Sequence, residues 1–277
     1  MTNRHPEPTL LLIPGYWLGA WAWDEVAEHL STAGRRSIAL TLPGLDAQDP
    51  QRATRTLDDQ AAAIEHALRR ESEAGRRCLV VAHSGANAPV SLVLDRHPEL
   101  VDQVVWVDSG PATAAPVTAG DATVDRAEVP PPPFETLAEQ ASLEGLDPAM
   151  LDRFRSRAVP EPGLVANQPV FLDNDQRFAV PTTLICCSIP SEQLLQLVKA
   201  GHPMFAEVAQ LQQVTLFELP TGHWPMWSRP NDLAELLITI ATHPQPEELS
   251  RTGPVVGRLP AGLIAQLDDA LRLHLQL

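Results

Sequence analysis

The chain has 277 residues, and 44% of them are hydrophobic, which is enough to bury one large core. Its formal net charge of −15 argues against binding to nucleic acid or to an anionic membrane, because both require a basic patch. No apolar run reaches the roughly 18 residues that a membrane-spanning helix needs.

Apolar stretches typical of strands alternate with helical patterns along most of the chain. We expect strands over residues 9–13, 37–42, 78–82, 104–107, 182–187 and 214–219. We expect helices over residues 23–33, 57–72, 88–95, 192–199 and 232–242. This alternation predicts an α/β fold with a mainly parallel sheet that helices cover on both faces. Ligands bind such sheets beyond the carboxyl ends of the strands.

One long interval, residues 111–180, interrupts this alternation. A proline-rich run at 130–133 precedes two short amphipathic stretches, at 134–142 and near 148–158. A loop of this length without a role would be unusual in a compact domain. We interpret it as a small helical cap on a core made of residues 1–110 and 181–244. A disordered insertion is the alternative, because residues 112–129 contain few bulky side chains.

The end of the chain, residues 245–277, resembles a linker followed by an amphipathic helix. Apolar residues recur there at helical spacing: Leu263, Ile264, Leu267, Leu271 and Leu275. We expect this helix to pack on its own domain or to form a homodimer.

The cysteines and the first residues of the chain bear on its location. Cys78, Cys186 and Cys187 lie in apolar runs, which indicates reduced core residues and neither disulfides nor metal ligands. Residues 1–9 lack the basic and apolar regions of a secretory signal. We therefore expect a cytoplasmic protein.

Ser84 lies where an apolar run gives way to small residues and then to a helical pattern. The string Ala82-His83-Ser84-Gly85-Ala86 is a variant of the Gly-x-Ser-x-Gly nucleophile elbow, in which a tight turn exposes a serine to a catalytic histidine. An ordinary Ser-Gly turn at the end of a strand is the alternative. We expect structural roles for His83 and Asn87.

His223 follows the last expected strand in the string Thr221-Gly222-His223-Trp224-Pro225, where a loop can reach an elbow serine. Its role would be general base and then general acid. The first strand runs into Pro14-Gly15-Tyr16, a turn that can aim backbone N–H groups at an oxyanion. The N–H groups of Tyr16 and Gly85 are the natural pair of donors.

Three motifs, in this order, resemble the α/β-hydrolase superfamily: the turn at residues 14–23, the elbow at Ser84 and Gly-His-Trp-Pro at 222–225. The first is similar to the His-Gly-x-x-x-Gly-x-Trp-x-Trp signature of plant methyl esterases and hydroxynitrile lyases, with Pro14 in place of the histidine. The resemblance spans residues 9–242. It implies an eight-stranded sheet, a Ser-acid-His triad and an oxyanion hole, with no metal and no organic cofactor.

The acid of the triad departs from the family pattern. Members usually have Asp after the strand that follows the cap, but residues 187–192 read Cys-Ser-Ile-Pro-Ser-Glu. Asp108 and Glu192 remain as candidates. Haloalkane dehalogenases and zearalenone lactonases are similar to this chain in having the acid after an earlier strand, the position of Asp108. Glu192 begins a helix, where a carboxylate is commonly only a favourable first-turn charge. We favour Asp108 and keep Glu192 as the alternative.

Aromatic side chains close to these positions predict an apolar substrate pocket. We expect it to be lined by Trp17, Trp224, Phe134 and Phe154. The sequence as a whole predicts a serine hydrolase that acts on a carboxylic ester or lactone of a small to medium apolar substrate. A non-hydrolytic protein of the same fold, a lyase, cyclase or ligand-binding module, is the alternative.

Overall fold

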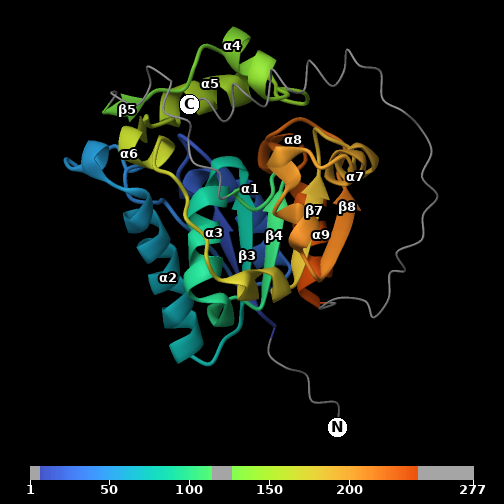
Figure 1. Ribbon diagram of the computed structural model, residues 1–277. Coiled ribbons are helices and arrows are strands. Elements are labelled where there is room, and N and C mark those ends of the chain that lie inside the picture. The colour runs from blue at the N-terminus through green and yellow to red at the C-terminus, as the bar shows by residue number, and fades with distance from the viewer. Residues whose placement is uncertain (1–6, 114–126, 243–277) are drawn as a thin grey trace.

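The computed structural model describes residues 7–113 and 127–242. A central sheet of six parallel strands has the order β2-β1-β3-β4-β7-β8 (Figure 1). The strands are β1 (Thr9–Ile13), β2 (Ser37–Ala39), β3 (Cys78–His83), β4 (Gln103–Val107), β7 (Thr182–Cys186) and β8 (Val214–Glu218). The expected α/β architecture is confirmed.

The expectation of eight strands in this sheet is wrong for the described part of the chain, where the sheet has six strands. Each of the six apolar stretches supplies one strand, and β2 and β8 are the two edges. The number eight came from the family resemblance, and the sequence itself contains only these six strand signals.

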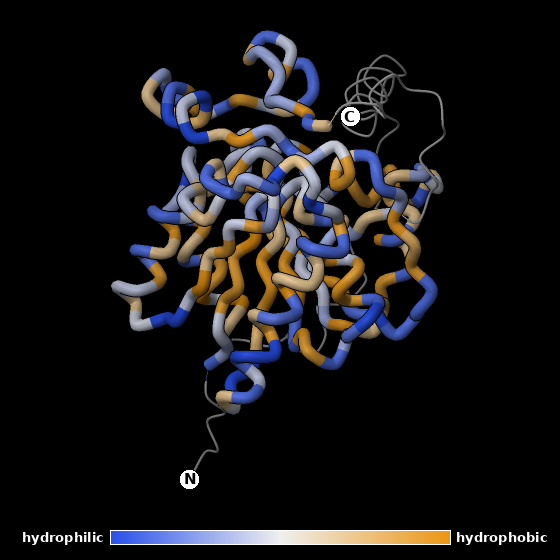
Figure 2. Tube along the Cα trace, turned by 90° about the vertical axis from the view of Figure 1, so that its left-hand side faces the viewer, coloured by the Kyte–Doolittle hydropathy of each residue, from blue (hydrophilic) through white to orange (hydrophobic). Residues whose placement is uncertain are grey.

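Helices cover both faces of the sheet. On one face lie α1 (Asp24–Thr32) and α9 (Pro230–Thr242), and on the other lie α2 (Leu57–Glu73), α3 (Asn87–Arg96) and α7 (Ser191–Lys199). Successive strand residues therefore enter opposite cores, as period-two geometry requires. Figure 2 shows hydrophobic strands at the centre of the molecule. Each fully buried leucine contributes about 1.5–3 kcal/mol.

Residues 127–166, which lie between β4 and β7, form a cap above the carboxyl ends of the strands (Figure 1). Its elements are β5 (Glu128–Val129), α4 (Phe134–Gln140), α5 (Pro148–Arg157), β6 (Glu161–Pro162) and α6 (Gly163–Ala166). The two amphipathic stretches are thus helices, and β5 and β6 pair antiparallel. Asp147 caps α5 by accepting a hydrogen bond from the Met150 N–H, and Pro148 fits the first helical position.

The remaining elements are short. They are α8 (Pro225–Ser228) and the 3₁₀ helices η1 (Ala20–Trp23), η2 (Arg52–Thr54), η3 (Ser84–Ala86), η4 (Pro98–Leu100), η5 (Asp175–Ala179), η6 (Pro203–Phe205) and η7 (Val208–Gln210). Across the described residues, no helix combines the length and the apolarity needed to cross a membrane. The amphipathic helix expected within 245–277 lies outside the described residues, as does the homodimer contact that it would make.

The cap is tied to the core around Trp17, in the turn after β1. The Trp17 N–H donates to Glu161 Oε2 at 3.2 Å, and its indole N–H donates to the Val129 carbonyl at 3.0 Å. The Val159 N–H donates to the Trp17 carbonyl at 2.9 Å. The cap thereby has a fixed position over the end of the sheet.

Candidate active site

The strand order gathers the candidate residues at one edge of the sheet. Strands β1, β3, β4, β7 and β8 are consecutive neighbours, and all run in the same direction. Beyond their carboxyl ends come, in the same order, Tyr16, Ser84, Asp108, Ser188 and His223. Residues up to 139 positions apart in the chain therefore meet within hydrogen-bond distance.

Ser84 occupies a strained turn between β3 and α3. Its φ is 51°, in the left-handed region that residues other than glycine rarely adopt. The positive φ falls on Ser84 itself, and Ala86 has an ordinary φ of −64°, which explains why alanine is tolerated in the elbow. Gly15 allows the turn after β1 to approach, because a Cβ there would lie 2.8 Å from the Ser84 Cβ.

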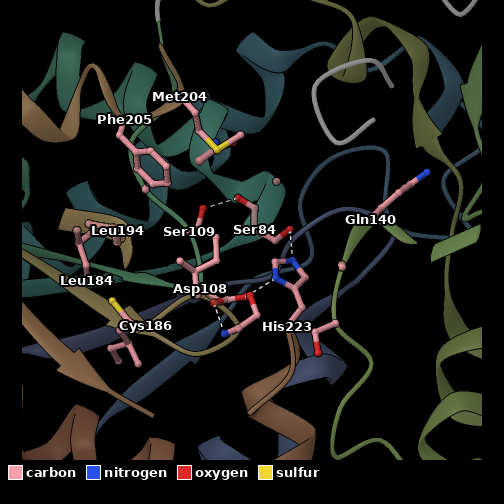
Figure 3. Close-up of a pocket in the computed structure, with 18 of the residues that line it drawn as sticks. Ser84, Asp108, Ser109, Gln140, Leu184, Cys186, Leu194, Met204, Phe205 and His223 are labelled. Atoms are coloured by element: carbon pink, nitrogen blue, oxygen red, sulfur yellow. Dashed lines mark hydrogen bonds and ion pairs between the residues drawn. The ribbon is translucent and has the colours of Figure 1, made fainter. Parts of the chain in front are cut away.

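A chain of hydrogen bonds joins Ser84, His223 and Asp108 (Figure 3). The Ser84 Oγ lies 2.8 Å from His223 Nε2, and His223 Nδ1 lies 2.6 Å from Asp108 Oδ2. A carboxylate can only accept, so Nδ1 donates, and in the neutral imidazole Nε2 is left to accept the Ser84 proton. This is the arrangement of a nucleophile, a base and a group that orients the base.

Asp108 accepts hydrogen bonds at both oxygens. Besides His223, its donors are the Cys187 N–H at 3.1 Å, the Ser188 N–H at 2.8 Å and the Ser188 hydroxyl at 2.6 Å. Burial raises the pKa of Asp108. The hydrogen bond and charge of His223, together with the two hydrogen bonds from Ser188, outweigh this effect and hold the pKa below its ordinary value. Glu192 is exposed on the first turn of α7, outside this network.

Ser188 is a member of the site that the sequence reasoning missed. It stands in the loop where relatives usually have the acid, and here it binds the acid contributed by the neighbouring strand. The available signal was indirect: if β4 and β7 pair, the loop after β7 must meet the residue after β4.

Tyr16, in the turn after β1, lies against Gly85, the residue after Ser84, and both line the cavity above Ser84. A Cβ on Gly85 would lie 2.6 Å from the Tyr16 ring, so the close approach requires glycine. Burial, followed by the nearby Glu161 carboxyl, raises the pKa of the Tyr16 phenol. The phenol therefore stays neutral beside the serine.

The loop of His223 is held from two sides. His83, which is buried, donates from Nε2 to the His223 carbonyl at 2.7 Å. On the cap side, the His223 N–H donates to the Ser142 carbonyl at 2.8 Å, and the Gly222 N–H donates to the Glu144 carbonyl at 3.2 Å. A Cβ on Gly222 would lie 2.4 Å from that Glu144 oxygen. The cap and β3 thus fix the backbone of the histidine together.

A cavity of about 550 Å³ opens above Ser84, between the sheet edge and the cap. Its walls come from β7, α7, η6 and η7 on one side and from the end of α4 on the other. In the two described ranges, no group of three His, Cys, Asp or Glu side chains is arranged to hold a metal ion.

The four aromatic residues expected to line the substrate pocket pack against one another, and two of them, Trp17 and Trp224, line a small pocket that also includes Ser84 and His223. Phe154 is buried and packs against Trp17, Phe134 and Trp224, with ring centroids 6.5, 5.8 and 5.5 Å away. None of the four lines the 550 Å³ cavity. They form an aromatic cluster between cap and core, because α5 places Phe154 against the rings of Trp17 and Trp224.

Comparison with known proteins agrees with this architecture. A model of the alpha/beta hydrolase family matches residues 10–236. Esterase PIR7B from Oryza sativa subsp. japonica is 30% identical over 99 residues, which are 35% of this chain and 37% of the esterase. Probable hydrolase R7 from Phoma sp. is 24% identical over 256 residues, which cover 85% of this chain and 98% of that protein.

Solved structures share the fold at low identity. An extracellular alpha/beta-hydrolase from a Paenibacillus species has a TM-score of 0.63 at 20% identity, covering 84% of this chain and 98% of that one. A methylesterase from Arabidopsis has a TM-score of 0.59 at 17% identity, covering 85% and 99%. The family model spans most of the sequence, and the strand order and site geometry accord with it. The chain belongs to the alpha/beta hydrolase family.

Proposed function

We propose that the protein is a serine hydrolase that cleaves a carboxylic ester or lactone, with Ser84 as nucleophile, His223 as base and Asp108 as the orienting acid. The observation behind this proposal is the continuous hydrogen-bonded chain from Asp108 to the Ser84 hydroxyl, which ends in an open cavity. The esterase and hydrolase names of the two curated relatives support the same class of reaction.

The geometry suggests the following steps. His223 Nε2 takes the proton of Ser84 as Oγ attacks the carbonyl carbon, and Asp108 stabilises the imidazolium that forms. The N–H groups of Tyr16 and Gly85 are the proposed oxyanion donors, and one such donor contributes about 3 kcal/mol to acyl transfer. The tetrahedral intermediate then expels the alcohol, which takes the proton from Nε2. A water molecule then attacks the carbonyl of the acyl-enzyme in the same way, with His223 as base, and the acyl group leaves Ser84 as the carboxylic acid.

Replacement of the nucleophile is the direct test. We expect Ser84→Ala to abolish hydrolysis of p-nitrophenyl acetate and covalent labelling by a fluorophosphonate, with an unchanged circular dichroism spectrum. Ser72→Ala is the matched control, because Ser72 is exposed on α2, away from the site, and it should keep full activity. Undiminished turnover in Ser84→Ala would refute the proposed nucleophile.

The labelling experiment also separates hydrolysis from the alternative chemistry. A native protein that reacts with the fluorophosphonate but hydrolyses no ester in a panel would use its activated serine in a different reaction, such as that of a lyase or cyclase. A protein that remains unlabelled would be a binding module. Both outcomes would reject the hydrolase proposal.

A further inference from the structure

The cavity beside Ser84 has two unlike sides. Apolar side chains from the end of the sheet and the segments after it line one of them: Leu184, Leu194, Met204, Phe205 and Val208. Figure 3 shows Leu184, Leu194, Met204 and Phe205 on one side of Ser84, while Gln140 of the cap lies on the other, beyond His223. A substrate bound at Ser84 would therefore extend one arm along an apolar wall.

Among the described residues that line the cavity, the permanently charged side chains are all acidic. No lysine or arginine is among its described lining residues, whereas Asp108 and Glu139 supply carboxylates. Cys186, in the apolar wall, does not add a thiolate, because burial raises the pKa of its thiol to about 12. An anionic group that entered this pocket would lose its hydration and find no cation among these residues.

We infer that the wall formed by Leu184, Leu194, Met204 and Phe205 determines specificity, and that it accepts an uncharged apolar arm and rejects one that ends in a carboxylate. This inference rests on the proposed hydrolase function and deepens it. The cavity volume of about 550 Å³ is large enough for an arm of several carbon atoms. Phe205, which is buried in η6, forms the surface that such an arm would cover.

A matched pair of substrates tests the inference on the native protein. p-Nitrophenyl hexanoate and the mono-p-nitrophenyl ester of adipic acid have the same leaving group and chain length, but only the second ends in a carboxylate. We expect kcat/KM for the adipate ester to be lower by about 100-fold, the cost of one poorly compensated charge in an apolar pocket. Values within about threefold of each other would overturn the inference.

p-Nitrophenyl acetate keeps this result separate from the proposed function. Acetate is too short to reach the wall, so its hydrolysis reports on the reacting residues alone. If the acetate is cleaved and the two long esters are cleaved equally, the specificity inference fails and the hydrolase proposal stands. If no ester is cleaved, the hydrolase proposal itself fails.

Two lysine variants locate the selectivity within the chain. Met204→Lys places a cation of similar length in the wall, and the partial exposure of Met204 lets the ammonium stay hydrated. Leu195→Lys is its control, because Leu195 is 49% exposed on α7, does not line the cavity and changes the net charge equally. We expect Met204→Lys alone to raise the adipate-to-hexanoate ratio of kcat/KM about tenfold. An equal rise in both variants would assign the selectivity to net charge and reject the wall.

A third variant needs no new charge. Phe205→Ala removes the aromatic surface from the wall, so we expect the hexanoate-to-acetate ratio of kcat/KM to fall at least about tenfold. A parallel loss with both substrates would show that Phe205 supports the fold or the reacting groups, and it would overturn its place in the specificity wall.

Discussion

Among the described residues, three other than glycine have a positive φ: Trp17 at 66°, Ser84 at 51° and Asp108 at 44°. Ser84 and Asp108 each follow a strand directly and contribute a side chain to the hydrogen-bonded chain with His223, whereas Trp17, in the turn after β1, binds the cap through Glu161 and Val129. Such a conformation costs about 1–2 kcal/mol per residue and persists only where surrounding contacts hold it. The strain is therefore concentrated where the proposed reacting groups and the attachment of the cap need fixed geometry.

The two candidate acids make opposite predictions. Asp108→Asn replaces an acceptor that holds the histidine with an amide that can disturb its tautomer, so we expect kcat to fall by about 10⁴. Glu192→Gln removes only an exposed charge on α7 and should change kcat by less than about twofold. The measurement is kcat for p-nitrophenyl acetate. A larger loss in Glu192→Gln than in Asp108→Asn would reverse the assignment.

Ser188 should influence the reaction through Asp108. The Ser188 hydroxyl donates a hydrogen bond to Asp108 and is one of the groups that lower its pKa. In Ser188→Ala the Asp108 carboxylate is therefore more basic, and the hydrogen-bonded pair of His223 and Asp108 holds a proton more strongly. We expect the acid limb of the kcat/KM profile to move to higher pH, with a modest loss at the plateau. Ser191→Ala, at the start of α7 and without a contact to Asp108, should leave the limb in place. Equal profiles for all three proteins would refute this role.

At the scale of elements, the sequence predicted all but one of the expected strands and helices to within two residues at each end, because periodicity reports directly on burial. Residues 37–42 are the clear difference, since only Ser37–Ala39 form β2. This edge strand has β1 as its one neighbour, and β1 ends at Ile13, before the turn at Pro14. The Leu40 N–H still donates to the Leu12 carbonyl at 3.0 Å, but residues 41–42 lie past the end of β1 and have no strand beside them in the described sheet.

The candidate site could be predicted only in part, because it also depends on which strands are neighbours in the sheet. Strand ends identified Ser84, Asp108 and His223, but the sheet order that brings β7 beside β4 is absent from the local sequence. The choice between Asp108 and Glu192, and the contact of Ser188, depend on that order. None of the four expected aromatic residues lines the 550 Å³ cavity, and only Trp17 and Trp224 line the small pocket beside Ser84, because position in the sequence does not indicate whether a ring faces a cavity or another ring.

Glu161 joins a cap strand to the core, is buried and has no cationic partner among the described residues. It accepts hydrogen bonds from the Trp17 N–H and, at 3.1 Å, from the side chain of Gln60. Burial raises its pKa to about 7, although these hydrogen bonds oppose the shift. The folded state thus holds the proton more tightly than the unfolded chain does. Stability is highest below the unfolded pKa and is lost as pH rises through the folded one.

Glu161→Gln should remove this dependence. We expect the variant to gain stability relative to the native protein as pH rises from about 4.5 to 7, by an amount of the order of 3 kcal/mol at most, with no further change above. Thermal unfolding of both proteins across pH 4–8 measures the difference, which corresponds to several degrees for a chain of this size. Gln60→Ala tests the hydrogen bond from Gln60 separately, because it removes this donor and keeps the Glu161 carboxyl. A difference between Glu161→Gln and native protein that is constant with pH would contradict the predicted titration.

At the scale of the whole molecule, the net charge of −15 acts at longer range than the contacts of the pocket. Surface charges create a potential that repels anions approaching the protein, and salt screens it over about 10 Å at 0.1 M. The loss of hydration inside the pocket responds far less to salt. An anionic ester is therefore disfavoured twice, once during approach and once on binding, and ionic strength separates the two contributions.

We expect the preference for p-nitrophenyl hexanoate over the adipate monoester to decrease about threefold to tenfold between roughly 10 mM and 500 mM KCl, and then to level off well above unity. Screening removes the repulsion during approach, and the pocket retains the rest. The hexanoate ester serves as its own control, because an uncharged substrate should show a nearly constant kcat/KM over this range. If the preference disappears at high salt, the protein's net charge alone accounts for it. If it does not change at all, the long-range field has no part in substrate choice.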